Sequence, residues 1–155
     1  MTRAGFYPIS SGKITFGRDG HWYCDGEVIP NAAIARLFSR ALEVLPDGRG
    51  RLALGEDTAW VTIEDTPWVV TTVDGSPVQG FVITLNDGTT EPLDATTLRV
   101  GAENVLYCRV KERHPARFLR PAYYALLRFA EPAGDGMVEL PIGAGRAVRL
   151  ATPVE

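Results

Sequence analysis

Apolar and polar residues alternate with a period of two over most of this chain, in short runs that end at turn-forming residues. Asp-Gly dipeptides mark many of these ends, and they begin at Asp19, Asp25, Asp47, Asp74, Asp87 and Asp135. A tight turn between twisted strands needs residues with positive φ, which glycine adopts without steric cost and aspartate tolerates. The pattern therefore predicts a chain built mainly of β-hairpins.

Two stretches show helical spacing of apolar residues instead, with recurrence at i, i+3, i+4, i+7 and i+8. The first spans residues 34–45, follows the potential N-cap Asn31 and is ended by Pro46. The second spans residues 119–130 and is closed by Pro132. Each stretch predicts a helix whose apolar face needs a sheet to cover it.

These elements predict an α+β fold of two small lobes, each a mainly antiparallel β-sheet packed on one helix. Residues 1–66 would form an N-terminal lobe of β-hairpins and a helix, and residues 67–155 a C-terminal lobe of a β-meander and a helix. The boundary falls at Thr66-Pro67, since proline cannot donate to a central ladder. Residues 137–140 and 147–150 would add edge strands. One continuous α+β domain is the main alternative.

Composition excludes several classes of protein. The 155 residues are 45% hydrophobic and 23% charged, which are ordinary globular values. A net charge of -3 gives no general attraction to nucleic acid or an anionic membrane, so we expect neither as a partner. The segment 1–11 lacks the apolar core of a signal peptide, and no apolar run approaches about 20 residues, so we expect a cytoplasmic protein.

The tryptophans lie in strand patterns among Asp, Glu and Thr, which predicts core or inter-lobe packing; they are Trp22, Trp60 and Trp68.

Short motifs in a consistent order along nearly the whole chain carry a family resemblance. They are Arg18-Asp19-Gly20-His21-Trp22, Gly26 with Ile29, Leu37-Phe38, Val61-Thr62-Ile63-Glu64-Asp65-Thr66-Pro67-Trp68, Asn86, Leu98-Arg99-Val100, Arg109 and Arg120-Pro121-Ala122-Tyr123-Tyr124. In these motifs the chain resembles a bacterial family known as domain of unknown function 1285. The resemblance implies a two-lobed α+β fold in which a strand-and-helix motif appears twice, with a second lobe loosely similar to a pleckstrin-homology barrel. It implies no established enzymatic activity and a suggested part in signal transduction.

The chain departs from the family pattern at two places. Before the second helix, the segment Val110–Pro115 replaces an Arg-Gly-Gly-like turn. Before Leu98, the pair Thr96-Thr97 replaces the common His-Pro.

Glu64 and Asp65 are the first candidates for chemistry. Neighbouring residues of a strand point to opposite faces, so the two carboxylates do not form one catalytic dyad. A carboxylate that faces the interior must be paired or hydrogen-bonded. We expect Asp65 to cap the turn before Pro67 or to pair with an arginine such as Arg99 or Arg109.

A basic run is the second candidate. Six cations against Glu112 give a local charge of +5, so the remainder carries -8; the cations are Arg109, Lys111, Arg113, Arg117, Arg120 and Arg128. Arg120, Tyr124 and Arg128 stand at i, i+4 and i+8, on the helix face opposite the apolar stripe. This arrangement suits recognition of an anion, and a solvated helix face is the alternative.

Catalytic and cofactor motifs are missing. The two histidines, His21 and His114, have no Cys, His or carboxylate at metal-ligand spacing, and no Gly-x-Ser-x-Gly elbow presents a serine. Gly143-Ala144-Gly145 is a predicted hairpin turn without the third glycine of a dinucleotide fingerprint. We therefore expect no catalytic residue, no metal and no cofactor.

The sequence thus favours a non-catalytic ligand-binding or signal-transduction module that recognises a small anionic ligand or an acidic segment of a protein partner. Arg109, Arg120 and Tyr124 would contact the anion, and Asp65 and Arg99 would hold the strands that frame the site. One alternative is a hydrolase or transferase acting on an anionic metabolite, with Asp65 or Glu64 as general base. Another is a structural or oligomerising protein that uses its edge strands.

Overall fold

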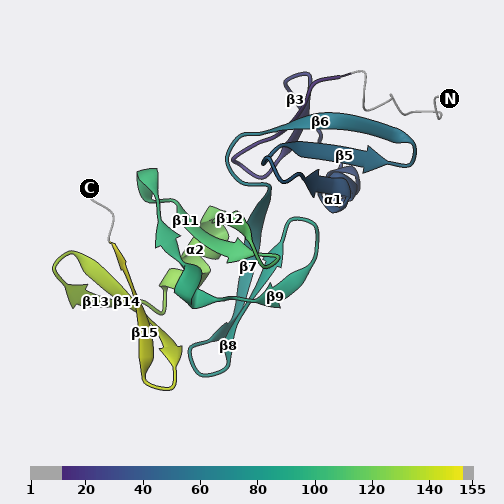
Figure 1. The fold of residues 1–155 in the computed structure, drawn as a ribbon. Coiled ribbons are helices and arrows are strands. Elements are labelled where there is room, and N and C mark those ends of the chain that lie inside the picture. Colours follow the sequence, from purple (N-terminus) through teal and green to yellow (C-terminus); the bar gives the residue numbers. More distant parts are fainter. Residues whose placement is uncertain (1–11, 152–155) are drawn as a thin grey trace. The chain divides into compact units, whose positions relative to one another are not determined.

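The computed structural model describes residues 12–151 and separates into two compact units between Pro67 and Trp68 (Figure 1). We name them the first unit and the second unit. The segment 1–11, for which no signal peptide was predicted, lies outside the described residues. Whether the units fold separately, as the predicted lobes 1–66 and 67–155, stays a prediction.

The described strands of the first unit form one mixed sheet. Its elements are β1 (Ile14–Phe16), β2 (Trp22–Cys24), β3 (Glu27–Val28), α1 (Ala32–Ala41), β4 (Leu42–Val44), β5 (Gly50–Leu54) and β6 (Asp57–Ile63). The order across the sheet is β3-β2-β1-β6-β5-β4. The central pair, β1 and β6, is parallel, with Ile14 opposite Val61, and the remaining pairs are antiparallel. The chain runs outward from the centre through one meander and returns to it through another.

The second unit contains a second mixed sheet and a smaller antiparallel one. The mixed sheet and its helices are β7 (Trp68–Ser76), β8 (Gly80–Leu85), β9 (Thr90–Pro92), η2 (Ala95–Thr97), β10 (Arg99–Val100), η3 (Ala102–Asn104), β11 (Leu106–Val110), β12 (His114–Phe118) and α2 (Arg120–Leu127). Its order is β10-β11-β12-β7-β8-β9, with β12 parallel to β7. The small sheet consists of β13 (Glu131–Gly134), β14 (Met137–Gly143) and β15 (Arg146–Ala151).

The two mixed sheets share one topology. In each, the first strand and the last strand are the central parallel pair, and each half of the sheet is a three-stranded antiparallel meander. The helix differs in position, because α1 connects the two meanders of the first sheet, whereas α2 follows the second sheet. The predicted α+β class is therefore confirmed. Each unit contains one mixed sheet of the same topology and one α-helix, so the repeat is one of fold topology.

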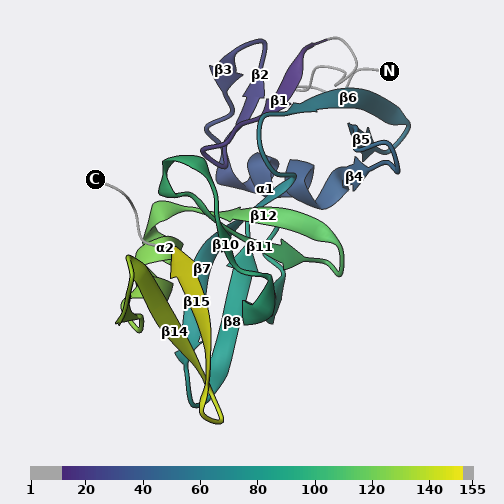
Figure 2. The same ribbon diagram turned by 60° about the vertical axis from the view of Figure 1, so that its left-hand side comes forward.

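The tail strands correct one expectation. Residues 137–140 and 147–150 were predicted as edge strands. They do form strands, but β14 is the middle strand of a separate sheet, since β13, β14 and β15 pair only with one another among the described strands. Figure 2 shows β14 and β15 beside β8. The tip of this hairpin packs closely, since a Cβ on Gly143 would lie 2.5 Å from the carbonyl oxygen of Pro77.

Five of the Asp-Gly dipeptides lie in turns between strands, as predicted, and the sixth does not. Asp25-Gly26 joins β2 to β3 with φ of 52° and 84°, and Asp135-Gly136 joins β13 to β14 with 53° and 71°. Asp74-Gly75 instead lies within β7, where Gly75 pairs with Phe81. Gly75 has φ of +99°, and a Cβ there would lie 2.1 Å from the carbonyl oxygen of Gly80. This dipeptide therefore permits a close strand approach rather than a turn.

The helix α1 begins where predicted and ends earlier. The Asn31 side chain accepts hydrogen bonds from the N–H groups of Ala33 and Ile34, which satisfies two donors of the first turn. The predicted end near residue 45 is wrong, because β4 starts directly at Leu42 and pairs with β5. The apolar residues of 42–45 match helical spacing and strand alternation equally, and the β5 partner decides between them.

Each unit has its own aromatic or aliphatic core. In the first unit Trp22 is 1% exposed and contacts Phe16 and Phe38, with ring centroids 4.9 Å and 5.5 Å away. Its indole N–H donates to the hydroxyl of Ser39 at 2.8 Å. Trp60 was predicted to pack in the core or between the lobes, but it is 54% exposed. The guanidinium of Arg49 lies over its ring. The core of the second unit includes β7, β8, β11 and α2 side chains, among them Val69, Val70, Ile83, Leu85, Leu106 and Leu126.

Candidate functional site

An open pocket in the second unit brings three arginine side chains together. Its volume is about 360 Å³, and its lining residues are Thr96, Thr97, Arg99, Cys108, Arg109, Arg113 and Pro115. We call it the arginine pocket. These residues come from η2, β10, β11, the loop of residues 111–113 that joins β11 to β12, and the start of β12. All belong to the second unit, so the pocket is formed within one compact part of the chain.

Strand register places Arg99 and Arg109 on the same face of the sheet. Arg99 lies opposite Tyr107 in the antiparallel pair of β10 and β11, and its guanidinium stacks 4.3 Å from the centroid of that ring. Arg109 lies opposite Pro115 in the pair of β11 and β12. Tyr107 and Arg109 are two residues apart on β11 and therefore project to one side.

Hydrogen bonds accepted by Asp94 order η2, and one accepted by Thr97 fixes it beside β11. The carboxylate of Asp94 accepts from the N–H and the hydroxyl of Thr96, at 3.1 Å and 2.6 Å. The hydroxyl of Thr97 donates to the Asp94 carbonyl at 2.7 Å and accepts from the N–H of Arg109 at 3.0 Å. The two hydroxyls of the pocket are therefore occupied as donors, and the guanidinium groups are left as its main donors to a ligand.

The ionisation of Asp94 and Cys108 follows from these contacts. Hydrogen bonds from Thr96, helped by the charge of Arg109, hold the pKa of Asp94 below its usual value, so this carboxylate is ionised. Cys108 is 3% exposed, and its burial raises the pKa of its thiol to about 12. The thiol is thus protonated at neutral pH and does not act as a nucleophile. Cys108 and Arg109 are adjacent in β11, so the buried Cys108 side chain points to the face of the sheet away from Arg109.

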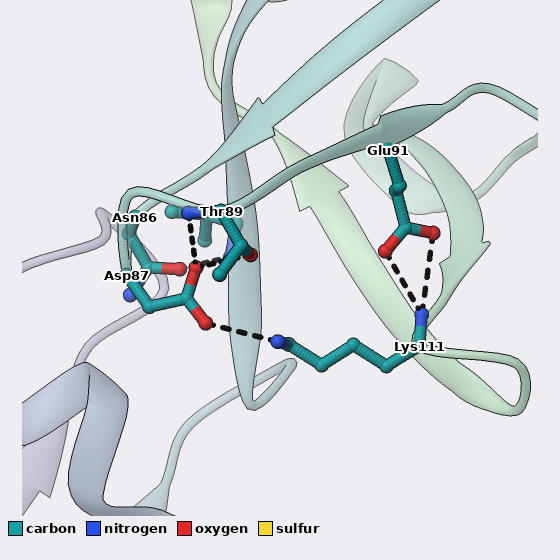
Figure 3. Close-up of polar contacts among 6 residues, drawn as sticks. Asn86, Asp87, Thr89, Glu91 and Lys111 are labelled. Carbon is teal, nitrogen blue, oxygen red and sulfur yellow. Dashed lines mark hydrogen bonds and ion pairs between the residues drawn. The ribbon is translucent and has the colours of Figure 1, made fainter.

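Lys111 anchors the β11–β12 loop, as Figure 3 shows. Its ammonium lies 2.9 Å from Oδ2 of Asp87, which is 3% exposed, and 5.0 Å from the ring centroid of Trp68. The Asp87 Oδ1 accepts from the N–H and hydroxyl of Thr89, at 2.9 Å and 2.6 Å. The N–H of Lys111 donates to both carboxylate oxygens of Glu91, at 3.3 Å and 3.2 Å. Lys111 thereby fixes the loop that carries Arg113 through its side-chain ammonium and through its backbone N–H.

The neighbouring Asn86 holds the turn of Asp87 against the central strand. The N–H of Val69 donates to the side-chain oxygen of Asn86 at 3.0 Å, and the N–H of Asn86 donates to the Val69 carbonyl at 3.1 Å. The β8–β9 turn is thus tied directly to β7.

The loop itself has an unusual backbone. Lys111 and Glu112 adopt φ of 50° and 71°, the left-handed region that costs a non-glycine residue about 1 kcal/mol or more. This is the segment in which the sequence departs from the Arg-Gly-Gly-like turn that the family resemblance implies. Glycine would relieve the strain, but it would remove the side chain that pairs with Asp87. Burial and the charges of Arg113 and Lys111 also lower the pKa of His114, which is consistent with a positive potential around the loop.

The helix residues of the predicted site lie apart from the lining of the pocket. Arg120, Tyr124 and Arg128 are exposed, as predicted for the polar flank of α2. The guanidinium of Arg120 donates to the Glu103 carbonyl at 3.4 Å and lies 5.0 Å from the Tyr123 ring. The side chain of Tyr124, 65% exposed, makes an edge contact with Tyr123. Of the five predicted site residues, the pocket contains Arg99 and Arg109.

The predicted carboxylates belong to the first unit. Glu64 and Asp65 follow β6 and are exposed, and Oε1 of Glu64 accepts the N–H of Arg18 at 3.0 Å. Both carboxylates are exposed, and neither lines the pocket of the second unit. The geometry therefore gives no support to the hydrolase or transferase alternative.

Two motifs that are distant in sequence meet near Gly17. A Cβ on Gly17 would lie 2.5 Å from Oδ1 of Asp19, 2.8 Å from Cε1 of Tyr23 and 3.3 Å from Oε1 of Glu64. The hydroxyl of Tyr23 donates to Asp19 in a short hydrogen bond. Burial alone would raise the pKa of Asp19, but this bond and the N–H of His21 lower it overall. The cluster explains why glycine stands at position 17, and sequence spacing did not indicate it.

Some pocket residues were not assigned from the sequence. Arg113 belongs to the predicted basic run without a site role, and Thr97 only marked a departure from the family pattern. The alternation of β11 and β12 about a three-residue loop is the signal that could have placed Arg113 next to Arg109. Within residues 12–151 no three metal-ligating side chains cluster. Over the same range, every helix is too short or too polar to cross a bilayer.

The fold and the pocket define an α+β protein with a basic, open pocket on its second mixed sheet. No family model and no curated protein matches the chain. The crystal structure of a DUF1285 family protein from Silicibacter pomeroyi DSS-3 matches with a TM-score of 0.69 and 24% identity, over 95% of this chain and 85% of that chain. The crystal structure of a DUF1285 family protein from Shewanella baltica OS155 matches with a TM-score of 0.60 and 19% identity, over 76% of this chain and 91% of that chain. The chain therefore shares the fold of solved DUF1285 proteins, which confirms the predicted resemblance at the level of structure.

Proposed function

We propose that this protein is a non-catalytic binding module whose arginine pocket holds a small anionic ligand. The observation that carries the proposal is the convergence of Arg99, Arg109 and Arg113 around one pocket. None of the described residues that line it carries a carboxylate. A guanidinium stays charged at any physiological pH and offers five N–H donors, so three of them favour an anion strongly.

The anchoring of the loop supports this role. A charged side chain gains little from a contact if it must first be immobilised, because rotamer entropy is lost on binding. Arg99 is restrained by stacking on Tyr107, and the backbone at Arg109 is fixed by Thr97. The ion pair of Lys111 with Asp87 restrains the loop that carries Arg113. The pocket is therefore largely ordered before a ligand arrives.

The remaining predicted residues keep smaller proposed roles. Arg120 and Tyr124 are proposed as a second, weaker anion contact on the exposed flank of α2. Asp65 is proposed only to order the end of β6. Membership of the DUF1285 family is also proposed, supported by the shared fold. A part in signal transduction is proposed on the family resemblance of the sequence alone. A relation of the second unit to pleckstrin-homology domains rests on its composition of one main sheet and one helix.

A thermal-shift screen with nucleotides, cyclic nucleotides and acidic metabolites tests the proposal. A ligand at about a hundredfold its Kd adds about 2.7 kcal/mol of stability, which is a clear rise in Tm. We expect the rise to vanish in the R109Q/R113Q variant and to persist in the matched control R128Q/R146Q, whose two arginines are exposed and lie outside the pocket. A rise that survives R109Q/R113Q but vanishes in R120Q/R128Q would place the anion on α2 and overturn the pocket assignment. A flat screen would overturn the small-ligand proposal and leave an acidic protein segment as the partner.

A further inference from the structure

The donors of the arginine pocket select among anions. A carboxylate presents two coplanar oxygens, which one guanidinium already satisfies in a bidentate pair. Here three guanidinium groups line one pocket, from β10, from β11 and from the β11–β12 loop. A tetrahedral group with three terminal oxygens can give each of them an acceptor. The number of converging donors therefore favours a phosphate over a carboxylate.

The charge balance around the pocket points the same way. Arg99, Arg109 and Arg113 contribute three positive charges, and Asp94, ionised beside Arg109, contributes one negative charge. Lys111 and Asp87 neutralise each other in their ion pair. Glu91, which accepts the Lys111 N–H, belongs to β9 and lies outside the pocket lining. The three lining arginines together with Asp94 therefore carry a net charge of +2, which a dianion compensates better than a monoanion.

The walls of the pocket leave room for an organic remainder. A volume of about 360 Å³ lies at the lower end of the roughly 300–1,000 Å³ typical of small-molecule sites. Pro115, which lies opposite Arg109 in the β11–β12 pair, supplies a neutral surface beside the arginines. This surface suits a small carbon skeleton attached to the charged group.

From these features we infer that the ligand is a small phosphate monoester, bound as the dianion. Arg99, Arg109 and Arg113 hold the phosphate, and Pro115 contacts the organic part. The inference rests on the proposed function and narrows it to one chemical class.

An NMR titration with simple probes tests the inference. The probes are methyl phosphate, glycerol 2-phosphate, dimethyl phosphate, glutarate and sulfate, each added to the ¹⁵N-labelled full chain. A phosphate monoester gains its second charge near pH 6. We therefore expect the affinity for methyl phosphate to rise severalfold between about pH 5 and 7.5, whereas sulfate stays dianionic. Sulfate also reports any change in the charge of the protein over this range. Asp94 and Cys108 do not change charge there, since the pKa of Asp94 is lowered from 3.8 and that of Cys108 is raised to about 12. Protonation of His114 as the pH falls would act in the opposite direction.

Variants separate this inference from the proposed function. R113Q should lower the affinity for glycerol 2-phosphate by about tenfold or more, because a hydrogen bond between charged groups is lost. R128Q on α2 should leave this affinity unchanged. Glutarate or dimethyl phosphate binding as tightly as the monoesters would overturn the inference but leave the anion pocket standing. A phosphoserine peptide that binds more tightly than glycerol 2-phosphate would overturn the small-molecule part. Absence of binding by every probe would overturn both the inference and the proposed function.

Discussion

Replacement of Asp87 by asparagine measures how firmly the β11–β12 loop is held. The Asp87 carboxylate accepts two hydrogen bonds from Thr89 and pairs with the Lys111 ammonium at 2.9 Å. Asparagine has nearly the same shape and keeps an oxygen for Thr89, so D87N changes mainly the charge. Its amide NH₂ would face the Lys111 ammonium, and two donors would then oppose each other.

The expected loss follows from the burial of the two partners. Removal of one member of a buried ion pair costs about 3–5 kcal/mol. The Asp87 side chain is 4% exposed but the Lys111 side chain is 29% exposed, so the ammonium can turn partly to water. We therefore expect D87N to lower the free energy of unfolding by about 2–3 kcal/mol. K111M, which keeps the aliphatic stem over Trp68, is the matched control, and the double variant should reveal a coupling of about 1–2 kcal/mol.

Urea unfolding at neutral pH, followed by circular dichroism and tryptophan fluorescence, measures these differences. The pH dependence adds a second check. Burial would raise the pKa of Asp87, but the hydrogen bonds from Thr89 and the pairing with Lys111 lower it below 3.8. The contribution of Asp87 is therefore full above that value and is lost as the pH falls through the lower folded pKa. A D87N protein within about 0.5 kcal/mol of the wild type at pH 7 would refute the reasoning, as would a difference that persists in strong acid.

Two further predictions concern the backbone and the buried thiol. G75A should destabilise the protein by about 2 kcal/mol or more, because a Cβ would lie 2.1 Å from the Gly80 carbonyl at a φ of +99°, and G55A, with no atom within 4 Å, should cost only about 1 kcal/mol. Equal urea midpoints for the two variants would contradict this. Burial raises the pKa of Cys108 to about 12, so the stability that its thiol contributes is present below pH 9 and declines as the pH rises beyond it. Iodoacetamide at pH 8 should therefore label the exposed Cys24 and leave Cys108 unmodified in the native protein; rapid labelling of a C24S variant would show that Cys108 is accessible.

Local signals in the sequence predicted the local parts of the fold. The Asp-Gly pairs and the Asn31 cap depend on a few neighbouring residues, and the structure confirms five of those turns and the start of α1. The parallel central pairs could not be predicted in this way, since Ile14 meets Val61 only when the whole sheet closes. Leu42 could not be assigned from local sequence either, because pairing with Leu52 of β5 determines that it belongs to a strand and not to the helix.

The candidate site was predictable only in part for the same reason. Its positive charge was visible as a basic run, and Arg99 and Arg109 were singled out. Placing Arg113 beside them required the register of the β11–β12 hairpin, and the role of Lys111 required knowledge that Asp87 lies opposite it. Cations of α2 looked equivalent in sequence, but Arg120 turns to the Glu103 carbonyl instead of the pocket.

The central parallel ladders also bear on how the chain reaches its native state. Each ladder joins strands about 50 residues apart, whereas every other pairing in its sheet joins strands that follow each other in the sequence. Hairpins of this kind close within about 1–10 μs, and a non-local ladder forms more slowly because it must overcome the closure entropy of the long intervening segment. In each unit we expect the two meanders to form first and then to pair through their central parallel strands. The rate-limiting step of folding would therefore be the pairing at the centre of the sheet and not at its edges.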